Sequence, residues 1–368
     1  MLRVFEAFAG YGSQSIALRN LGIEHEVVAI SEIDKYAIKA YEAIHGPTNN
    51  LGDICKINPS DIPDHDLFTY SFPCQDLSVA GKQAGLGKGT RSGLLYECEK
   101  IIEAKKPKYL LLENVKNLVG KKFKPQFDEW LEYLEGLGYT NYWKVLNAKD
   151  YGVPQNRERV FVVSILGEHE SYKFADKIPL DKCIADILED KVDEKYYLSE
   201  EIQKRFKLTN QNKNIIGTTK PDFRTIGQRD VVYDKNGIMG ALVATDYKQP
   251  KQILDFVGGI GDKDWVGDNK KLSRNYPQGN RVYSSEGIAC SQTSNGGGLG
   301  GPTGLYLTDY RIRKLTPREC FRLMGMKDDD IDKIQAAGIS NTQQYKMAGN
   351  SIVVDVLEAI FKNLFMEG

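Results

Sequence analysis

The sequence predicts an α/β protein, with a doubly wound, mostly parallel sheet and a second, smaller β-rich domain. Short apolar runs alternate with helical patterns through residues 1–166, which is typical of βαβ units. The first apolar run leads into a glycine-rich turn that opens a helix, as in the first unit of a doubly wound sheet. Residues 170–308 then change to short β-like pieces rich in Lys, Asn, Asp, Gly and Tyr.

The domain boundaries follow these changes of pattern. A chain of 368 residues is long enough for two domains of about 150 residues each. We assign residues 1–169 to the sheet domain and residues 170–308 to the smaller domain. Residues 309–368 return to helical periodicity. We expect them to rejoin the sheet domain, with one helix from Met347 to Phe365 covering the sheet.

Composition argues against several classes of protein. The chain is 41% apolar and 27% charged, with a net charge of −1, as in ordinary globular proteins. Its six cysteines and four histidines show no C-x-x-C pair and no regular spacing, so we expect no metal site. The sequence shows no secretory signal and no apolar run of about 18 residues. We therefore expect no membrane association and a cytoplasmic protein with reduced thiols.

Charge is distributed unevenly along the chain. Residues 201–314 carry 18 Lys and Arg against 11 Asp and Glu, which leaves the remainder acidic. A basic module on an acidic body favours a nucleic-acid partner. Solvated protein surfaces also show such asymmetry, so the pattern does not decide the question alone.

A glycine-rich turn follows the first predicted strand, Leu2–Ala7. The turn reads Phe8-Ala9-Gly10-Tyr11-Gly12 and opens a helix. Two glycines let the backbone approach a ligand closely, and the helix N-terminus offers unpaired N–H groups. Ser15 stands where the dinucleotide fingerprint needs its third glycine. The alternative is a tight turn that binds nothing.

Two carboxylates follow the next strands. Glu32 comes after a strand over 26–30, 20 residues beyond Gly12, where ribose hydroxyls are held in nucleotide sites. Asp53 follows a weaker, third strand candidate. The alternative reading of the 31–34 turn is a helix N-cap. With the glycine turn, the two acids describe a site for an adenosine-containing ligand without a pyrophosphate.

Cys74 follows a buried strand over 66–70 and the break at Pro73. Ligands bind at the carboxyl ends of strands in open α/β sheets, so a thiol there is presented to a substrate. The alternative is a small buried hydrophobe. The glycine-rich stretch 79–93 is predicted to be a loop that orders on a partner, or else a plain linker.

A further carboxylate and two arginines belong to the same edge. Glu113 ends a buried strand that begins at Tyr109. Arg157 and Arg159 lie between two strands expected to pair antiparallel, over 141–147 and 159–166. One or both arginines are expected to reach the site, the alternative being a surface salt bridge. Further on, Thr316, Pro317 and Glu319 form a capping-box pattern that begins a helix.

In this order the motifs resemble those of the DNA cytosine carbon-5 methyltransferases of bacteria and phages. The resemblance covers residues 2–166 and 311–366, and the gap is where that family keeps a variable target-recognition domain. It rests on Phe8–Gly12, Glu32, Asp53, Pro73-Cys74-Gln75, Glu113-Asn114-Val115, Gln155–Arg159, Arg313–Glu319 and Gly349-Asn350-Ser351.

The resemblance implies the S-adenosylmethionine-dependent methyltransferase fold, with residues 1–169 catalytic and residues 170–308 recognising the target. It implies an enzyme that methylates carbon 5 of a flipped-out cytosine in a specific duplex sequence, through a covalent adduct. By resemblance Cys74 is the nucleophile, Glu113 holds the ring nitrogen and amine, and Arg159, supported by Arg157, contacts the ring carbonyl.

The resemblance also assigns binding residues. Phe8, Gly10 and Gly12 are given to the methionine end of S-adenosylmethionine, Glu32 to its ribose, and Ile33 and Asp53 to its adenine. The other residues assigned to the cofactor are Tyr11, Ile54, Pro73, Asn350 and Ser351. Those assigned to DNA are Gln75, Ser78, Lys82 and Arg91.

For partners, we expect double-stranded DNA, a monomeric enzyme and, in a restriction-modification system, a cognate endonuclease in a prokaryotic or phage-infected cell. A transfer-RNA cytosine-5 methyltransferase shares these motifs, and the long basic insert favours duplex DNA over it. A catalytically idle DNA-binding regulator is the other alternative. An intact Cys74, Glu113 and Arg159 argue against an idle protein.

Overall fold

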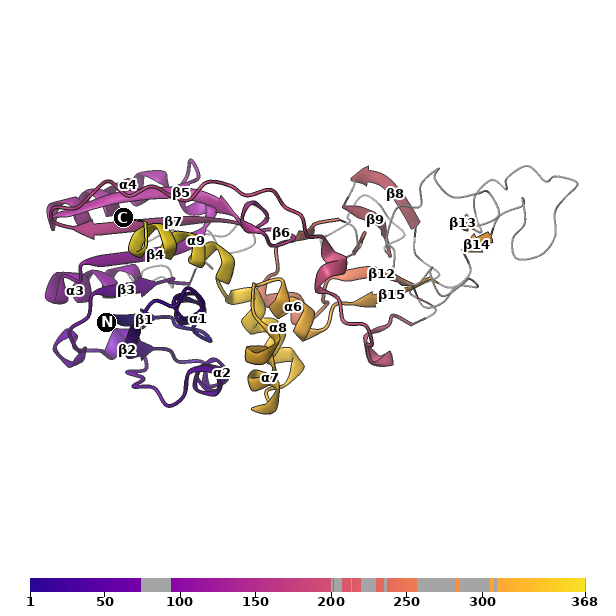
Figure 1. Cartoon of the computed structure of the whole chain (residues 1–368), viewed down its shortest axis with the longest axis horizontal. Coiled ribbons are helices and arrows are strands. Elements are labelled where there is room, and N and C mark those ends of the chain that lie inside the picture. The colour runs from indigo at the N-terminus through magenta and orange to yellow at the C-terminus, as the bar shows by residue number, and fades with distance from the viewer. Residues whose placement is uncertain are drawn as a thin grey trace, which may run out of the picture. The chain divides into compact units, whose positions relative to one another are not determined.

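The computed structural model divides the chain into two compact units (Figure 1). Unit 1 comprises residues 1–192, 236–251 and 315–368, and unit 2 comprises residues 193–235 and 252–314. The structure describes residues 1–73, 94–199, 201, 207–212, 214–219, 230–234, 237–256, 282–284, 305–307 and 310–367.

Unit 1 is built on a six-stranded sheet in the order β2-β1-β3-β4-β7-β5. Neighbouring strands among the first four pair in parallel, and β7 runs antiparallel to both β4 and β5. This confirms the mostly parallel sheet and the antiparallel pair at its edge. The strands are β1 (Leu2–Ala7), β2 (His25–Ser31), β3 (Leu67–Tyr70), β4 (Tyr109–Val115), β5 (Tyr139–Asn147) and β7 (Glu158–Leu166).

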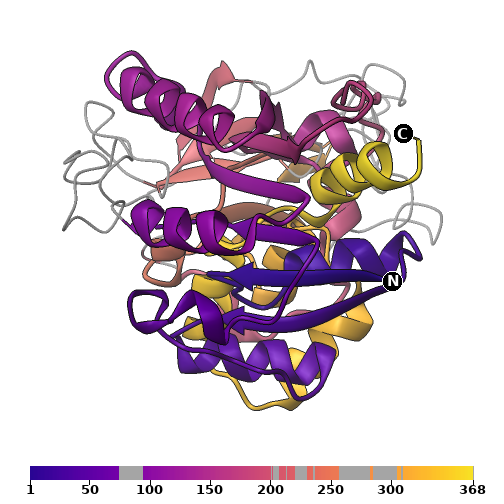
Figure 2. The same cartoon turned by 90° about the vertical axis from the view of Figure 1, so that its left-hand side faces the viewer.

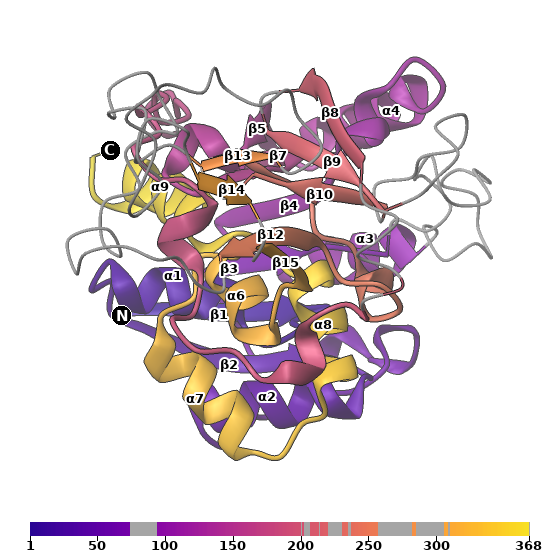
Figure 3. The ribbon, with the colours of Figure 1, turned by 90° about the vertical axis from the view of Figure 1, so that its right-hand side faces the viewer.

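Helices cover both faces of this sheet. Side chains on one face, such as Phe5 and Phe68, form a core with α3 and α4. On the other face Glu6 contacts α1 and α2. Figures 2 and 3 show the strands between α3 and α4 on one side and α1 and α9 on the other. The helices are α1 (Ser13–Asn20), α2 (Lys35–His45), α3 (Leu95–Lys105), α4 (Lys124–Gly136) and α9 (Val354–Phe365).

The C-terminal segment returns to unit 1, as expected. The prediction of a single helix from Met347 to Phe365 is wrong. The structure has α6 (Pro317–Arg322), α7 (Asp328–Ala336) and α8 (Asn341–Asn350), followed by a break before α9. Ser351 is extended, with φ −77° and ψ 169°. The apolar pattern runs across this break, so periodicity alone does not reveal it. The break places residues 350–352 beside the pocket described below.

Part of the insert belongs to unit 1. Within it, β11 (Met239–Gly240) pairs in parallel with β6 (Gln155–Asn156), and the 3₁₀ turn η9 (Ala244–Tyr247) follows. Residues 170–192 also belong to unit 1. Unit 2 thus has bounds different from those of the predicted smaller domain, 170–308. The role of residues 170–308 in target recognition stays a prediction. The other 3₁₀ turns of unit 1 are η1 (Ile54–Lys56), η2 (Pro59–Asp61), η4 (Lys116–Val119), η5 (Ala148–Tyr151) and η6 (Ile184–Ile187).

Unit 2 contains a five-stranded sheet in the order β15-β12-β10-β9-β8 and a parallel pair, β13 and β14. Leu198, Val232 and Ile312 form its small apolar core. Its elements are η7 (Glu194–Tyr196), β8 (Lys207–Asn212), β9 (Ile215–Thr218), β10 (Val231–Tyr233), β12 (Gln252–Phe256), β13 (Val282–Ser284), β14 (Leu305–Leu307) and β15 (Tyr310–Lys314).

The described ranges contain no helix long and apolar enough to cross a membrane. Over the same ranges, no cluster of three or more His, Cys, Asp or Glu side chains is arranged to hold a metal ion.

The capping box at α6 is confirmed and gives a stability prediction. The Thr316 hydroxyl accepts from the Glu319 N–H at 3.2 Å, and the Glu319 carboxylate accepts from the Thr316 N–H at 2.7 Å. Thr316→Ala should lower the free energy of unfolding by about 1 kcal/mol, because a helix N–H loses its acceptor. Thr316→Ser keeps the hydroxyl and is the control in urea unfolding. Equal unfolding midpoints for the two variants would contradict this role of the cap.

Candidate active site

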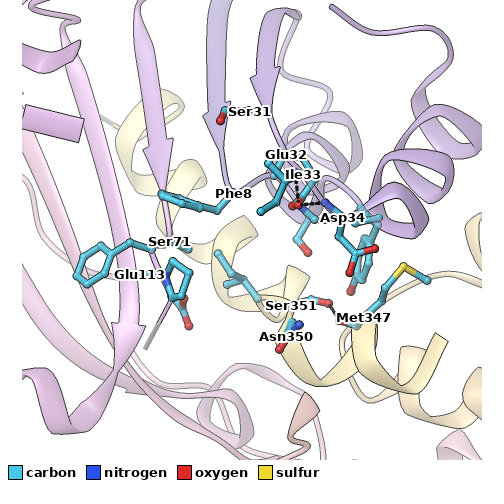
Figure 4. Close-up of a pocket in the computed structure, with 18 of the residues that line it drawn as sticks. Phe8, Ser31, Glu32, Ile33, Asp34, Ser71, Glu113, Met347, Asn350 and Ser351 are labelled. Carbon is cyan, nitrogen blue, oxygen red and sulfur yellow. Dashed lines mark hydrogen bonds between the residues drawn. The ribbon is translucent and has the colours of Figure 1, made fainter. Parts of the chain in front are cut away.

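A cavity of about 450 Å³ lies at the carboxyl edge of the unit 1 sheet. The residues that follow β1, β2 and β3 and the last residues of β4 form most of its wall, and the end of α8 closes it. In Figure 4, Glu32, Ile33 and Asp34 lie on one side and Ser71 and Glu113 on the other. Because β7 is antiparallel to β4, its first residues meet this same edge.

The glycine turn forms a narrow part of the wall. Phe8, Gly10 and Gly12 have φ values of 56°, 60° and 82°, a region that favours glycine. Phe8 and Gly10 line the cavity. A Cβ at Gly12 would lie 2.4 Å from Nε2 of His45 and 2.7 Å from a ring carbon of Tyr41. Gly12 therefore serves close packing behind the wall, and this packing supports the turn.

Glu32 joins the glycine turn to the end of β2. One carboxylate oxygen accepts from the Gly10 N–H at 2.9 Å. The other accepts from the N–H groups of Ile33 and Asp34 at 2.7 and 2.8 Å. Three backbone donors thus hold the carboxylate in one orientation at the cavity wall. Beside it, Ile33 is 72% exposed and lines the cavity, so it presents an apolar surface at the rim.

The third wall segment is tied to β2 by an asparagine that the sequence analysis missed. The Asn50 amide donates to the Glu32 carbonyl at 3.1 Å, and its oxygen accepts from the Gly52 N–H at 3.0 Å. The weak third strand is a single bridge, Ile30 to Asn50. Asp53 caps η1 through the Cys55 N–H, and both Asp53 and Ile54 line the cavity.

At the opposite wall a carboxyl and a guanidinium form a pair. Nε of Arg159 lies 3.2 Å from Oε1 of Glu113, and both side chains are largely buried. Burial raises the pKa of Glu113, and the charges of Arg159 and Arg157 oppose that rise. The carboxyl is therefore closer to taking up a proton at neutral pH than an exposed glutamate.

Asn114 fixes the segment that leads to Cys74. Its amide donates to the Phe72 carbonyl at 3.1 Å, and its oxygen accepts from the Val115 N–H at 2.9 Å. Ser71, Phe72 and Pro73 all line the cavity. Residues 71–73 thus lie at the same edge of the sheet as Glu113. The sequence feature that indicated Asn114 was its position at the end of a predicted buried strand.

The predicted residues divide into three groups. Cys74, Gln75, Ser78, Lys82 and Arg91 lie outside the described residues. Gly12 lies behind the wall. The residues that line the cavity are Phe8, Gly10, Tyr11, Glu32, Ile33, Asp53, Ile54, Pro73, Glu113, Arg157, Arg159, Asn350 and Ser351.

Lys346 is a cavity residue that no local pattern indicates. Its Nζ donates to the Asp34 carboxylate at 2.6 Å, which links α8 to the start of α2. Burial alone would raise the pKa of Asp34, and the bonds from Lys346 and the Tyr36 N–H outweigh it, so the pKa is lowered. The two residues are 312 positions apart in the chain, which explains why the sequence gives no signal of the contact.

A buried polar cluster supports the glycine turn from behind. The Glu6 carboxylate accepts from the hydroxyls of Ser15 at 2.8 Å and Tyr41 at 3.0 Å. The Tyr41 ring lies against His45, with centroids 4.5 Å apart. Nε2 of His45 lies 3.1 Å from the Tyr11 carbonyl, so a neutral imidazole protonated there donates to it. The cluster thus connects β1, α1 and α2 beneath the turn.

Comparison with known proteins gives one consistent result. A family model described as C-5 cytosine-specific DNA methylase matches residues 2–366. The type II methyltransferase M2.ScrFI of Lactococcus lactis subsp. cremoris is 40% identical, over 99% of each chain. The orphan methyltransferase M.SPRI of Bacillus phage SPR is 33% identical, over 99% of this chain and 97% of that one. The crystal structure of S. pombe Dnmt2 methyltransferase is similar in fold, with a TM-score of 0.65 and 19% identity over 100% and 99% of the two chains.

The Glu6 cluster predicts a pH dependence of stability. Burial raises the pKa of Glu6 from 4.5 to about 7, although the bonds from Ser15 and Tyr41 limit the rise. Between these values the folded state keeps a proton that the unfolded state releases, so this contribution to stability is lost as pH rises. Burial lowers the pKa of His45 from 6.5 to about 4. The contribution of His45 to stability therefore increases as pH rises over nearly the same range.

Glu6→Gln should remove the pH dependence of stability that is due to Glu6 and leave the one that is due to His45. The free energy of unfolding of Glu6→Gln, minus that of the natural protein, should therefore increase by about 3 kcal/mol from pH 4.5 to 7. Urea unfolding at half-unit pH steps measures the difference. A difference that does not change with pH would show that Glu6 titrates normally.

Proposed function

The chain belongs to the C-5 cytosine-specific DNA methylase family, and from this premise we propose how its cavity performs the reaction. It transfers a methyl group from S-adenosylmethionine to carbon 5 of a flipped-out cytosine in duplex DNA, through a covalent adduct with Cys74. One observation carries the proposal: the Glu32 wall and the Glu113–Arg159 pair share a single cavity, which residues 71–73 also line.

The cofactor wall fits S-adenosylmethionine in size and chemistry. The cavity of about 450 Å³ falls within the roughly 300–1,000 Å³ of small-molecule sites. Glu32 offers a fixed acceptor for ribose hydroxyls, Ile33 an exposed apolar surface for adenine, and Asp53 an acceptor for the adenine amine. The turn at Gly10 and the N-terminus of α1 suit the polar methionine end. When bound, S-adenosylmethionine supplies an electrophilic methyl group on a sulfonium centre.

The catalytic residues activate carbon 5 of the ring. The Cys74 thiolate adds to carbon 6, and the electron pair of the 5,6 double bond moves toward the ring nitrogen and carbonyl. Glu113, whose pKa is raised, donates a proton at nitrogen 3, while Arg159 donates to the carbonyl oxygen. Carbon 5 is then nucleophilic enough to take the methyl group, and the sulfonium leaves as the thioether S-adenosylhomocysteine. Return of the nitrogen 3 proton to Glu113, loss of the carbon 5 proton to solvent water and departure of the thiolate restore the aromatic ring.

The cavity opens on one edge of a packed sheet, so a cytosine reaches it only after leaving the base stack. We propose duplex DNA as the substrate and residues 170–308 as the segment that selects the methylated word. Gln75, Ser78, Lys82 and Arg91 are proposed to contact the DNA. Bisulfite sequencing of DNA from cells that express the protein identifies the word. It also tests the function, because an unmethylated genome would contradict it.

The cofactor assignment predicts the effect of removing the Glu32 carboxylate. Glu32→Ala should weaken S-adenosylmethionine binding by about 1–3 kcal/mol, because a charged acceptor is lost and the Gly10 turn loses its anchor. Calorimetric titration measures the affinity. Glu42→Ala, at an exposed position on α2, is the matched control and should bind as the natural protein does. Unchanged affinity in Glu32→Ala would count against the assignment.

The covalent step predicts a trapped adduct. With 5-fluorocytosine at the target, carbon 5 carries no hydrogen to lose after methylation, so the thiolate cannot depart. The DNA should then stay bonded to the protein through boiling in detergent, and only when S-adenosylmethionine is present. Cys74→Ser should give no adduct. Mapping of the bond to Cys55 or Cys98 by mass spectrometry would show that the nucleophile is a different cysteine.

A further inference from the structure

Arg157 occupies an unusual place in the cavity wall. It is only 3% exposed, and its guanidinium donates to three backbone carbonyls. Nη1 donates to Leu242 at 2.7 Å, and Nη2 donates to Ser351 at 2.6 Å and Gly349 at 3.2 Å. By resemblance, Arg157 was expected to support the contact of Arg159 with the cytosine ring. These bonds direct its guanidinium to the main chain of two other segments.

One of these segments is the end of α8. The last carbonyls of a helix have no partner within the helix, and they carry the negative end of its dipole. The Gly349 carbonyl is one of them, and Ser351 lies just beyond, where the chain turns out of the helix. A buried guanidinium at this point satisfies both carbonyls. It thereby fixes the break that brings Asn350 and Ser351 to the cavity.

The other segment is the part of the insert that folds onto unit 1, residues 237–251, here called the return segment. Gln155 holds it beside Arg157: its oxygen accepts from the Leu242 N–H at 3.0 Å, and its amide donates to the Leu323 carbonyl at 2.6 Å. A Cβ at Gly349 would lie 2.3 Å from the carbonyl carbon of Val243. The return segment and α8 thus touch through their main chains.

The return segment is continuous with unit 2 at both of its ends, because unit 2 comprises residues 193–235 and 252–314. Arg157 joins this segment to the cavity wall by hydrogen bonds to Leu242 on one side and to Gly349 and Ser351 on the other. We propose that Arg157 is a positioning residue that couples the return segment to the Gly349–Ser351 wall, so that DNA binding and cofactor binding strengthen one another. This inference rests on the function proposed above.

The coupling has a measurable form. If duplex DNA raises the affinity for the cofactor by some factor, the cofactor raises the affinity for DNA by the same factor. S-adenosylhomocysteine lacks the methyl group, so it reports binding without turnover. Its dissociation constant is measured by calorimetry without and with a duplex that carries the methylated word. The ratio of the two constants is the coupling factor.

The natural protein should show a coupling factor within the range of about 5–150 that is usual for linked sites. Arg157→Lys keeps the positive charge, but a single ammonium cannot span the Leu242 and Ser351 carbonyls as the planar fork does. It should bring the factor to within about twofold of 1. Arg157→Met, similar in length and uncharged, should do the same if it folds.

Arg322→Lys is the matched control. Arg322 also lies in unit 1 and donates to two backbone carbonyls, those of Ile187 and Leu188, and it does not line the cavity. Arg322→Lys should keep the natural coupling factor even if it lowers the melting temperature. A natural protein with a factor of 1, an unchanged factor in Arg157→Lys, or an equal loss in both variants would overturn the proposal. A protein that binds no S-adenosylhomocysteine and methylates no DNA would instead overturn the proposed function.

Discussion

The site depends on one constraint of sheet geometry: β1, β2, β3 and β4 are mutually parallel and end at the same edge. Parallel strands need crossover connections, so residues that end successive strands meet in space although they are far apart in sequence. Glu32 and Glu113 face one cavity for this reason. The reversed strand β7 begins at that edge, which brings Arg159 to Glu113.

The wall of the cavity is organised by side chains that bind the backbone. Glu32, Asn50 and Asn114 each connect segments from different strands through backbone N–H or carbonyl groups. Each such bond satisfies a polar group that would be costly to leave unpaired. The wall is therefore set before any ligand arrives, which is what electrostatic recognition of a developing charge needs.

The sequence predicted the parts of the structure that local pattern controls. The strand ends, the glycine turn, the cavity positions of Glu32 and Asp53, and the capping box at Thr316 all follow from neighbours within a few residues. The contacts of Arg157 and Lys346 span up to 194 and 312 residues, and no local pattern encodes them. The break between α8 and α9 was missed for the same reason, because it is stabilised from outside the helices.

Four contacts attach the return segment to the rest of unit 1 through main-chain atoms of that segment. Arg157 binds a carbonyl, Gln155 binds an N–H, β11 pairs through its backbone, and Gly349 meets the backbone at Val243. None of these four contacts depends on the identity of a side chain of the segment. Burial restricts the side chains of Met239, Leu242, Asp246 and Lys251. An insert attached in this way can change its exposed side chains while its main-chain bonds to the rest of unit 1 stay the same, which is what the proposed recognition of different DNA words by related enzymes requires.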